Sequence, residues 1–334
     1  MKGYQITEFG IAHLAMGNLD EPRLRARDVL VRIRASSLNY RDLMMIEGTY
    51  NPKLKLPLVP FSDGAGEVVE IGGEVTRWKI GDRVCPVFMQ GWIDGELDYA
   101  KFKTTLGGDL DGCLREFGAF HEDGLVRIPT TLSFEQATTL PCAGVTAWNA
   151  LMVSGSLRQG ETVLLQGTGG VSMLALQLAK LAGARTIITS SSNEKLERAK
   201  ALGADEVINY REHEDWDSIA LDLTRKRGVD HVIEIGGAGT LARSMRAVRI
   251  GGHIAVIGVV AGKGEISNVP IFMKALRLTG VFVGSREMFE NMNTAIDRSG
   301  VKPVIGRQFN FDQVQEALQF MKTGTHFGKI VVTI

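Results

Sequence analysis

The chain has few cysteines, no excess charge of either sign and no long apolar run. Its three cysteines, Cys85, Cys113 and Cys142, are scattered over 334 residues without the paired spacings of a disulfide framework. That usage predicts a reducing compartment, the cytoplasm. Lysine plus arginine and aspartate plus glutamate both number 38, so the net charge is near zero. This balance gives no indication of nucleic acid or another polyanion as a partner.

The sequence also lacks segments that we would expect to enter a membrane. The apolar runs, such as residues 254–260, have the length of a strand and are far too short to span a bilayer. Residues 1–8 lack the apolar core of a signal peptide. We therefore expect no membrane partner.

The most informative stretch is residues 162–190, where an apolar β-branched run meets a glycine cluster. The cluster Gly167-Thr-Gly169-Gly170-Val171-Ser172 opens an apolar helical segment, and a second β run follows. Gly167 permits a tight turn, and Gly169 has no Cβ to keep the backbone from a phosphate. The helix start at Gly170 and Val171 offers free N–H groups.

The order of strand, glycine turn, helix and second strand predicts that this stretch binds a dinucleotide pyrophosphate. The alternative is a glycine turn in an ordinary βαβ unit. One departure from the fingerprint is Ser172, which replaces its third glycine. Serine is small enough for close packing of helix on strand.

The sequence pattern divides the chain into two parts. In residues 1–128, short strand-like runs are separated by turn residues, which predicts a compact β domain. Residues 129–284 alternate strand-like and helical runs, which predicts an α/β fold with a doubly wound, six-stranded parallel sheet. The expected strands are 162–166, 186–190, 206–210, 231–235, 253–257 and 278–283. Residues 285–334 return to mixed elements, and we expect them to rejoin the first domain.

Four segments in order resemble the medium-chain dehydrogenase/reductase superfamily: residues 60–68, 75–84, 140–148 and 200–210. The resemblance covers nearly the whole length and is greatest to the quinone oxidoreductase and enoyl reductase branches. It implies a GroES-like β domain followed by a Rossmann domain, and a homodimer.

In zinc alcohol dehydrogenases of this superfamily, ligands come from a Cys, a Gly-His-Glu motif and a later Cys. Here the matching positions hold Asn39, Phe61-Ser62-Asp63 and Cys142. Because amide and hydroxyl groups are poor zinc ligands, we expect no metal. Residues 86–112 contain no cysteine, so the family's structural zinc lobe is not expected either. Cys142 is interpreted as a small core residue near the cofactor cleft rather than a ligand or nucleophile.

The residues after the second Rossmann strand indicate the cofactor. NAD enzymes place an acidic residue there to accept from the ribose 2′-OH, but this chain has Ser190, Ser191 and Ser192, with Lys195 close by. Serines and a lysine suit a 2′-phosphate, so we expect NADPH. Tyr210, in an Ile-Asn-Tyr segment, matches a family residue that contacts this phosphate. Alternatively, Ser191 and Glu194 form a capping box for a helix over 194–202.

The resemblance implies three further cofactor contacts. Thr146 matches a residue that touches the nicotinamide, and Val259 matches one beside the nicotinamide ribose. Lys329, in a late glycine-basic element, matches a residue near the cofactor phosphates. The alternatives are a helix-interior hydroxyl for Thr146 and a surface lysine for Lys329.

Without zinc, a reductase needs other groups to stabilise the negative charge that follows hydride transfer. Residues 39–50 resemble the region of mitochondrial-type enoyl reductases that supplies donors. Asn39 and Arg41 are candidate donors, and Tyr50 matches the proton donor of that group. Alternatively, Asn39 and Asp42 are only a helix cap, and Tyr50 packs beside Pro52. Trp92 either lines the substrate cleft or packs in a loop.

These observations favour a zinc-independent, NADPH-dependent oxidoreductase that reduces quinones or α,β-unsaturated carbonyls by hydride transfer. Its substrate is a small molecule. One alternative is a zinc-type alcohol dehydrogenase with ligands elsewhere. Another is a catalytically idle NADPH-binding protein that acts as a sensor or structural protein.

Overall fold

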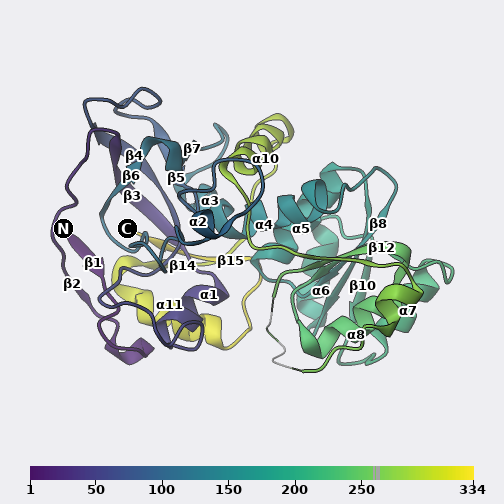
Figure 1. Cartoon of the computed structure of the whole chain (residues 1–334). Helices are drawn as coiled ribbons and strands as arrows, with labels where there is room; N and C mark the ends of the chain where they lie inside the picture. The colour runs from purple at the N-terminus through teal and green to yellow at the C-terminus, as the bar shows by residue number, and fades with distance from the viewer. Residues whose placement is uncertain (259, 261–263) are drawn as a thin grey trace. The chain divides into compact units, whose positions relative to one another are not determined.

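The computed structural model describes residues 1–258, 260 and 264–334 (Figure 1). The chain forms two compact units, Met1–Val145 with Gly284–Ile334, and Thr146–Val283. In the first unit, α3 (Phe134–Ala137) contacts β3 (Asp28–Ser37) and β4 (Asp63–Ile71). The domain boundary that we expected after residue 128 therefore lies N-terminal to the boundary between these units.

The second unit contains a six-stranded parallel sheet with the order β10-β9-β8-β11-β12-β13, in which every neighbouring pair is parallel. Its strands are β8 (Thr162–Gln166), β9 (Arg185–Ser190), β10 (Glu206–Asn209), β11 (Val229–Glu234), β12 (Val248–Val256) and β13 (Arg277–Gly280). This order, with the first strand at the centre, is that of a doubly wound Rossmann sheet. The predicted fold class is confirmed.

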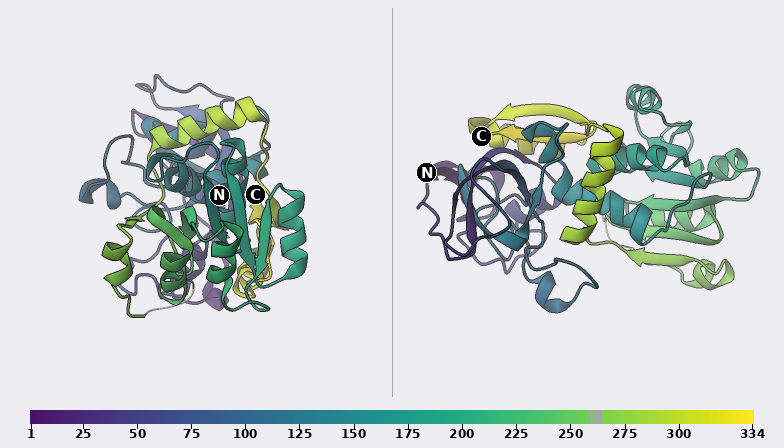
Figure 2. Two further views of the ribbon diagram at one scale, coloured as in Figure 1. Left: turned by 90° about the vertical axis from the view of Figure 1, so that its right-hand side faces the viewer. Right: turned by 90° about the horizontal axis from the view of Figure 1, so that it is seen from above.

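Burial explains the composition of this sheet. Every residue of β8 and β11 is buried, and β8 carries the apolar run Val163-Leu164-Leu165 that is typical of a strand covered on both faces. The helices of this unit are α5 (Gly170–Leu181), α6 (Asn193–Ala201), α7 (Trp216–Leu223), α8 (Ala238–Ala247) and α9 (Val269–Met273). Trp216, Leu241 and Met245 from α7 and α8 share a core with residues of the strands. The left view in Figure 2 faces this unit.

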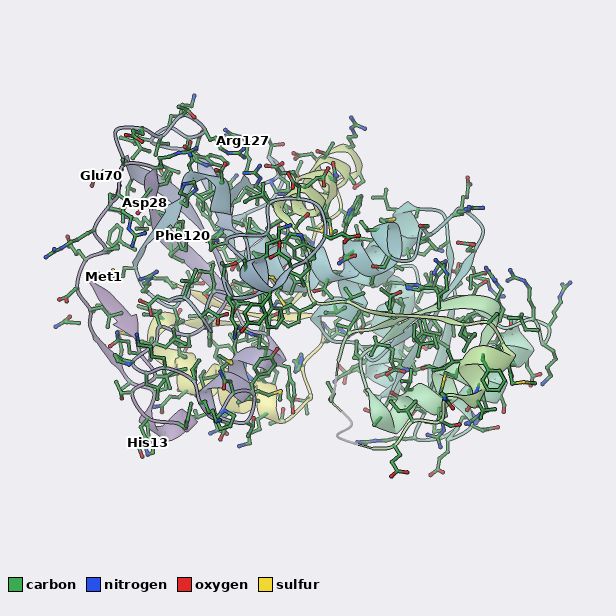
Figure 3. The ribbon with its side chains drawn as sticks, viewed as in Figure 1. Met1, His13, Asp28, Glu70, Phe120 and Arg127 are labelled. Carbon is green, nitrogen blue, oxygen red and sulfur yellow. The ribbon has the colours of Figure 1, made fainter. Side chains whose placement is uncertain are left out.

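The first unit is built on β3, a ten-residue strand that pairs with β4, β6 and β15. Its sheet has the order β14-β15-β3-β4-β5-β7, with β6 on β3, while β1 and β2 pair separately. The remaining strands are β1 (Lys2–Tyr4), β2 (Met16–Asn18), β5 (Arg83–Pro86), β6 (Phe117–His121), β7 (Leu125–Arg127), β14 (Ile305–Asn310) and β15 (Lys329–Thr333). Figure 3 labels Asp28 on β3 and Phe120 on β6.

The C-terminal segment rejoins the first unit because β15 pairs antiparallel with the end of β3. Val331 lies opposite Ser37, and Thr333 lies opposite Ala35. The longer helices of this unit are α1 (Tyr40–Ile46), α10 (Arg286–Ser299) and α11 (Val314–Lys322), and the short ones are α2 (Tyr99–Phe102) and α3. A further short helix, α4 (Val145–Trp148), begins at the boundary of the two units. Within the described ranges, no helix combines the length and apolarity needed to cross a membrane.

Two buried histidines face each other in the parallel sheet. The Nδ1 atoms of His231 on β11 and His253 on β12 are 3.4 Å apart, and His231 Nε2 is 2.9 Å from Glu161 Oε2. In the part of the chain that is described, His253 Nε2 has no hydrogen-bond partner. The pKa of His253 is lowered to about 4, mainly by burial and also by the neighbouring His231 and Arg277.

This pair predicts a pH-dependent stability. The unfolded chain takes up a proton at His253 near pH 6.5, whereas the folded chain does so only near pH 4. The stability that neutral His253 contributes is therefore present above pH 6.5 and is lost as the pH falls toward 4. We expect His253→Leu to lose less free energy of unfolding than the parent over that interval, measured by urea denaturation. The exposed His213, changed to Gln, is the control, and parallel losses in parent and His253→Leu would contradict the assignment.

Candidate active site

Four side chains of the first unit form a closed ring of hydrogen bonds, which we call the Lys329 ring: Lys329, Asn39, Ser62 and Asp63. Lys329 Nζ donates to Asn39 Oδ1 at 2.6 Å and lies 3.3 Å from Asp63 Oδ2. Asn39 Nδ2 donates to Ser62 Oγ at 3.3 Å, and Ser62 Oγ donates to Asp63 Oδ1 at 2.9 Å. The ring joins residues that are as much as 290 positions apart in sequence.

Strand pairing brings these residues together. Ser37, at the end of β3, lies opposite Asp63 of β4 on one side and Val331 of β15 on the other. Lys329 is the first residue of β15, and Asn39 is the second residue after the end of β3. The three segments therefore converge at one end of β3. Ser37 Oγ also lies 3.0 Å from Asp63 Oδ2 and 2.8 Å from Thr138 O, and its single proton is shared between these two acceptors.

The ring is largely closed to solvent. Lys329 is 3% exposed and Asp63 is fully buried. The alternative interpretation of Lys329 as a surface lysine is therefore wrong. Its ammonium also donates to Leu38 O at 2.7 Å, so all three N–H groups have acceptors inside the protein. The contact of Lys329 with a cofactor phosphate stays a prediction that this geometry does not favour.

Asp42 lies beside the ring at the start of α1. Its Oδ2 accepts the Asn39 backbone N–H at 2.8 Å, as expected for a helix cap, while the Asn39 side chain takes part in the ring. Burial is the main cause that raises the pKa of Asp42 to about 6; Arg41 opposes this shift, and the Asp63 carboxylate contributes to it.

The donor set does not fit a zinc ion. Asn39 Oδ1 and Asp63 Oδ2 already bind the Lys329 ammonium, and a second cation beside it would be repelled. Burial raises the pKa of the Cys142 thiol well above its usual value, which disfavours the thiolate that zinc requires. Over the described residues, no three His, Cys, Asp or Glu side chains gather in a way that could hold a metal ion.

Arg41 and Tyr50 lie together near α1. The Arg41 guanidinium is 5.6 Å from the Tyr50 ring centre and 4.9 Å from that of Phe88. It donates to Leu106 O at 3.1 Å and to Thr105 Oγ1 at 3.2 Å, so its orientation is fixed by packing. Tyr50 is 42% exposed, which leaves it accessible to a ligand.

The turn before Tyr50 depends on a glycine. Gly48 has a φ of 72°, and a Cβ there would lie 2.7 Å from the Phe9 ring. Both Thr49 and Tyr50 donate their backbone N–H groups to Met44 O. This turn anchors the backbone of Tyr50 to the end of α1.

Trp92 is buried in its loop. Its indole N–H donates to Gly95 O at 2.9 Å, and only 5% of the residue is exposed. The sequence leaves two interpretations of Trp92, as a residue that lines the substrate cleft or as one that packs in a loop, and the structure favours loop packing.

In the second unit, the glycine cluster forms the turn between β8 and α5. Gly167 has a φ of 69°, the left-handed region that favours glycine, and Gly169 caps the helix that begins at Gly170. Ser172 is buried, and its Oγ donates to Gln166 O at 2.5 Å. Serine thus ties the helix to the strand at the position where the fingerprint has glycine. Gly170 and Val171, in the first turn, are partly exposed.

The ends of β9 and β10 bring the other predicted cofactor residues close together. Tyr210 is 41% exposed and donates its backbone N–H to Ser190 O at 3.0 Å. The N-cap of α6 is Ser192, whose Oγ accepts from Lys195 N, so the expected cap at Ser191 is wrong. Lys195 is partly buried, and this burial is the main reason that its pKa lies below the ordinary value.

One cation of this region was missed. Arg211 follows Tyr210 directly and lies near enough to Lys195 to lower its pKa. The sequence signal that could have identified Arg211 is its position directly after the Ile-Asn-Tyr segment. Of the other predicted residues, Thr146 is buried in α4, and Val259 lies outside the described residues.

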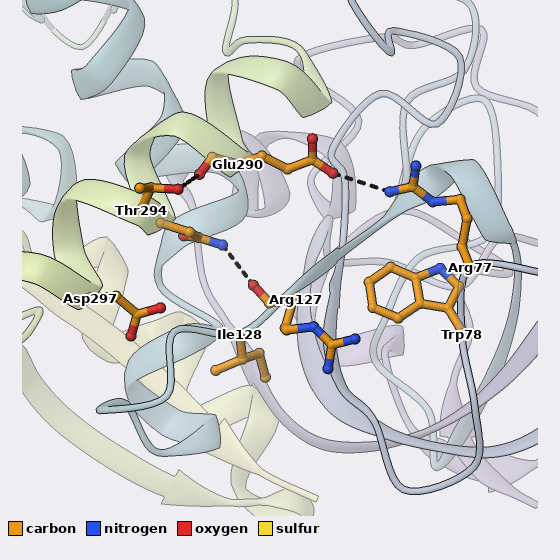
Figure 4. A pocket seen from close by; sticks show the side chains of 8 residues that line it. Arg77, Trp78, Arg127, Ile128, Glu290, Thr294 and Asp297 are labelled. Atoms are coloured by element: carbon orange, nitrogen blue, oxygen red, sulfur yellow. Dashed lines mark hydrogen bonds and ion pairs between the residues drawn. The ribbon is translucent and has the colours of Figure 1, made fainter.

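A pocket of about 390 Å³ lies elsewhere in the first unit, between α10 and the segments that carry Trp78 and Arg127 (Figure 4). Its arginines are already paired: Arg77 with Glu290 at 3.1 Å, and Arg127 with Asp82 at 3.0 Å. None of the site residues predicted from the sequence lines it.

Comparison with known families agrees with this architecture. Residues 25–130 match the alcohol dehydrogenase GroES-like domain, and residues 170–298 match the zinc-binding dehydrogenase family. A solved structure of a Sinorhizobium meliloti protein described as an alcohol dehydrogenase has a TM-score of 0.94 and 41% identity, covering 100% of this chain and 98% of that one.

Three relatives cover most of the chain. A zinc-type alcohol dehydrogenase-like protein of Schizosaccharomyces pombe is 42% identical, over 93% of this chain and 92% of its own. A 2-methylene-furan-3-one reductase of Solanum lycopersicum is 32% identical over 99% and 79%. A quinone oxidoreductase of Mus musculus is 29% identical over 100% and 98%. With its GroES-like and Rossmann units, the chain belongs to the medium-chain dehydrogenase/reductase superfamily of oxidoreductases.

Proposed function

We propose that this protein is a zinc-independent, NADPH-dependent reductase of quinones or α,β-unsaturated carbonyls. The observation that carries the proposal is the Lys329 ring, in which the amide of Asn39 and the hydroxyl of Ser62 stand at positions that match metal ligands of zinc relatives, and the Lys329 ammonium donates to Asn39. The tomato and mouse relatives, named as a reductase of an enone and a quinone oxidoreductase, support the substrate class. The proposal includes a cytoplasmic location, which the cysteine usage predicts, and a homodimer, which the resemblance implies.

The second unit provides the groups that would hold the cofactor. The turn at Gly167–Val171 presents backbone N–H groups to a pyrophosphate. Ser190, Ser191, Lys195 and Arg211 are the groups that would receive a 2′-phosphate, with Tyr210 beside them. When bound, NADPH supplies the hydride.

The first unit provides donors for the charge that hydride transfer creates. Adding hydride to an enone or quinone leaves a negative oxygen, and one well-placed donor to such an oxygen contributes about 2.7–4 kcal/mol. Asn39 offers an amide N–H, and Tyr50 offers a hydroxyl that can also deliver a proton. Arg41 adds positive charge beside Tyr50.

The first prediction from the proposed function concerns zinc, because the relative with the highest identity among those described above is named as zinc-type. We expect the purified protein to carry less than one equivalent of zinc and to keep its reductase activity in a chelator. Metal analysis and NADPH oxidation with quinones and enones test this. One equivalent of tightly held zinc, with activity lost on its removal, would instead support a zinc-type alcohol dehydrogenase.

The second prediction concerns the choice of cofactor. NADPH should bind more tightly than NADH, and Lys195→Ala should weaken NADPH binding by about 1–3 kcal/mol with little effect on NADH. Fluorescence titration gives both dissociation constants. Lys200→Ala, on the last turn of the same helix, is the matched control and should leave NADPH binding unchanged. Equal affinities of the parent for the two cofactors would refute the assignment.

The third prediction concerns proton delivery. Phenylalanine keeps the bulk of Tyr50 but removes its proton, so Tyr50→Phe should lower kcat and kcat/KM for enones together, by ~10²-fold or more. NADPH affinity should change little. Quinones should show a smaller effect, because their reduced anions take protons readily from water.

Tyr99→Phe, at a residue that is 77% exposed, is the control for the loss of one tyrosine hydroxyl. If Tyr50→Phe reduces enones and quinones at the parent rate, Tyr50 is a packing residue.

A further inference from the structure

The chemistry of the Lys329 ring fixes the direction of each of its hydrogen bonds. An ammonium group only donates, and a carboxylate only accepts. The atom of Asn39 beside Lys329 Nζ is therefore the oxygen, and Ser62 gives its single proton to Asp63. Ser62 Oγ is then left to accept from Asn39 Nδ2. The orientation of the Asn39 carboxamide is thus determined by its partners.

This orientation leaves one donor of Asn39 available. Nδ2 carries two hydrogens, and Ser62 accepts one of them. Asn39 is partly exposed, whereas Lys329, Ser62 and Asp63 are buried. The ring therefore holds its charges inside the protein and leaves an amide N–H at its exposed corner.

Lys329 also strengthens that donor. An ammonium 2.6 Å from Oδ1 draws electron density toward the amide oxygen, which makes the N–H more positive. The contacts with Leu38 O and Asp63 keep the ammonium from moving away. If Lys329 were lost, Asn39 Oδ1 would lose its ammonium donor, and only the 3.3 Å hydrogen bond from Nδ2 to Ser62 would hold the carboxamide.

We propose that Lys329 is a positioning residue, whose ammonium holds the Asn39 carboxamide so that Nδ2 donates to the oxygen that becomes negative during reduction. The inference rests on the proposed reductase function. It gives Lys329 a role different from that of a phosphate ligand, and it makes Asn39 the group that contacts the substrate.

A double-mutant cycle with Asn39→Leu and Lys329→Met tests this coupling. We expect each single variant to lower kcat for enone reduction by ~10²-fold, the loss typical of one oxyanion donor. The double variant should be no slower than Asn39→Leu alone, because Lys329 acts through Asn39. The dissociation constant of NADPH should stay at the parent value in Lys329→Met.

Asn39→Asp supplies a variant that keeps the contact with Lys329. Aspartate has the same shape and can still accept from the ammonium, but it has no N–H to give. We expect kcat to fall by ~10²-fold while the Tm stays at or above that of the parent. If Asn39 serves only to anchor Lys329, Asn39→Asp keeps the parent kcat, and the proposal is overturned.

Lys329→Met leaves the Asp63 carboxylate buried without its cation, which can prevent folding. In that case Lys329→Met is combined with Asp63→Asn. The combined change is made both in the parent and in Asn39→Leu, and we again expect that the losses in kcat do not add. Additive losses, or a weaker NADPH affinity in the Lys329 variants, would overturn the positioning role while the parent remains an active reductase. A parent that reduces neither quinones nor enones would instead refute the proposed function.

Discussion

The ion pair between Lys329 and Asp63 is the interaction around which the first unit is organised. It joins the beginning of β15 to the beginning of β4, with β3 paired between them. Removing a carboxylate and an ammonium from water is costly unless their remaining hydrogen-bond positions are filled. Here Asn39, Leu38 O, Ser37 and Ser62 fill them, so the C-terminal strand meets the sheet at a polar cluster with defined partners.

The same ion pair bears on the chemistry of the site. A positive charge stabilises an oxygen that becomes negative, and either a metal ion or a lysine can supply that positive charge. With an ammonium among Asn39 and Asp63, the residues at the zinc-ligand positions of this superfamily are already partners of a lysine. A quinone or an enone needs less polarisation than an unactivated carbonyl. Hydrogen-bond donors on a rigid ring are suited to that smaller demand.

The Rossmann unit could be predicted from the sequence because its signals are local. The strand, the glycine turn and the helix at 162–181 lie within one βαβ unit, and the all-buried β8 has an apolar run at its centre. Helix boundaries were less certain: three successive serines each offer a capping oxygen, and the geometry selects Ser192. The partners of Lys329 could not be predicted, because they are 266 to 291 residues away in sequence.

The two halves of the proposed site therefore depend on different physical constraints. The proposed phosphate-binding half would use backbone N–H groups at the start of α5, so it would depend on chain conformation, and Ser172 stands there in place of a glycine. The reducing half uses side-chain donors, so it depends on which residues strand pairing brings to one end of β3. A change at Asn39 or Lys329 alters the second half without touching the turn at Gly167. Because each half is held by its own contacts, the chemistry of the ring can change while the backbone contacts for the cofactor are kept.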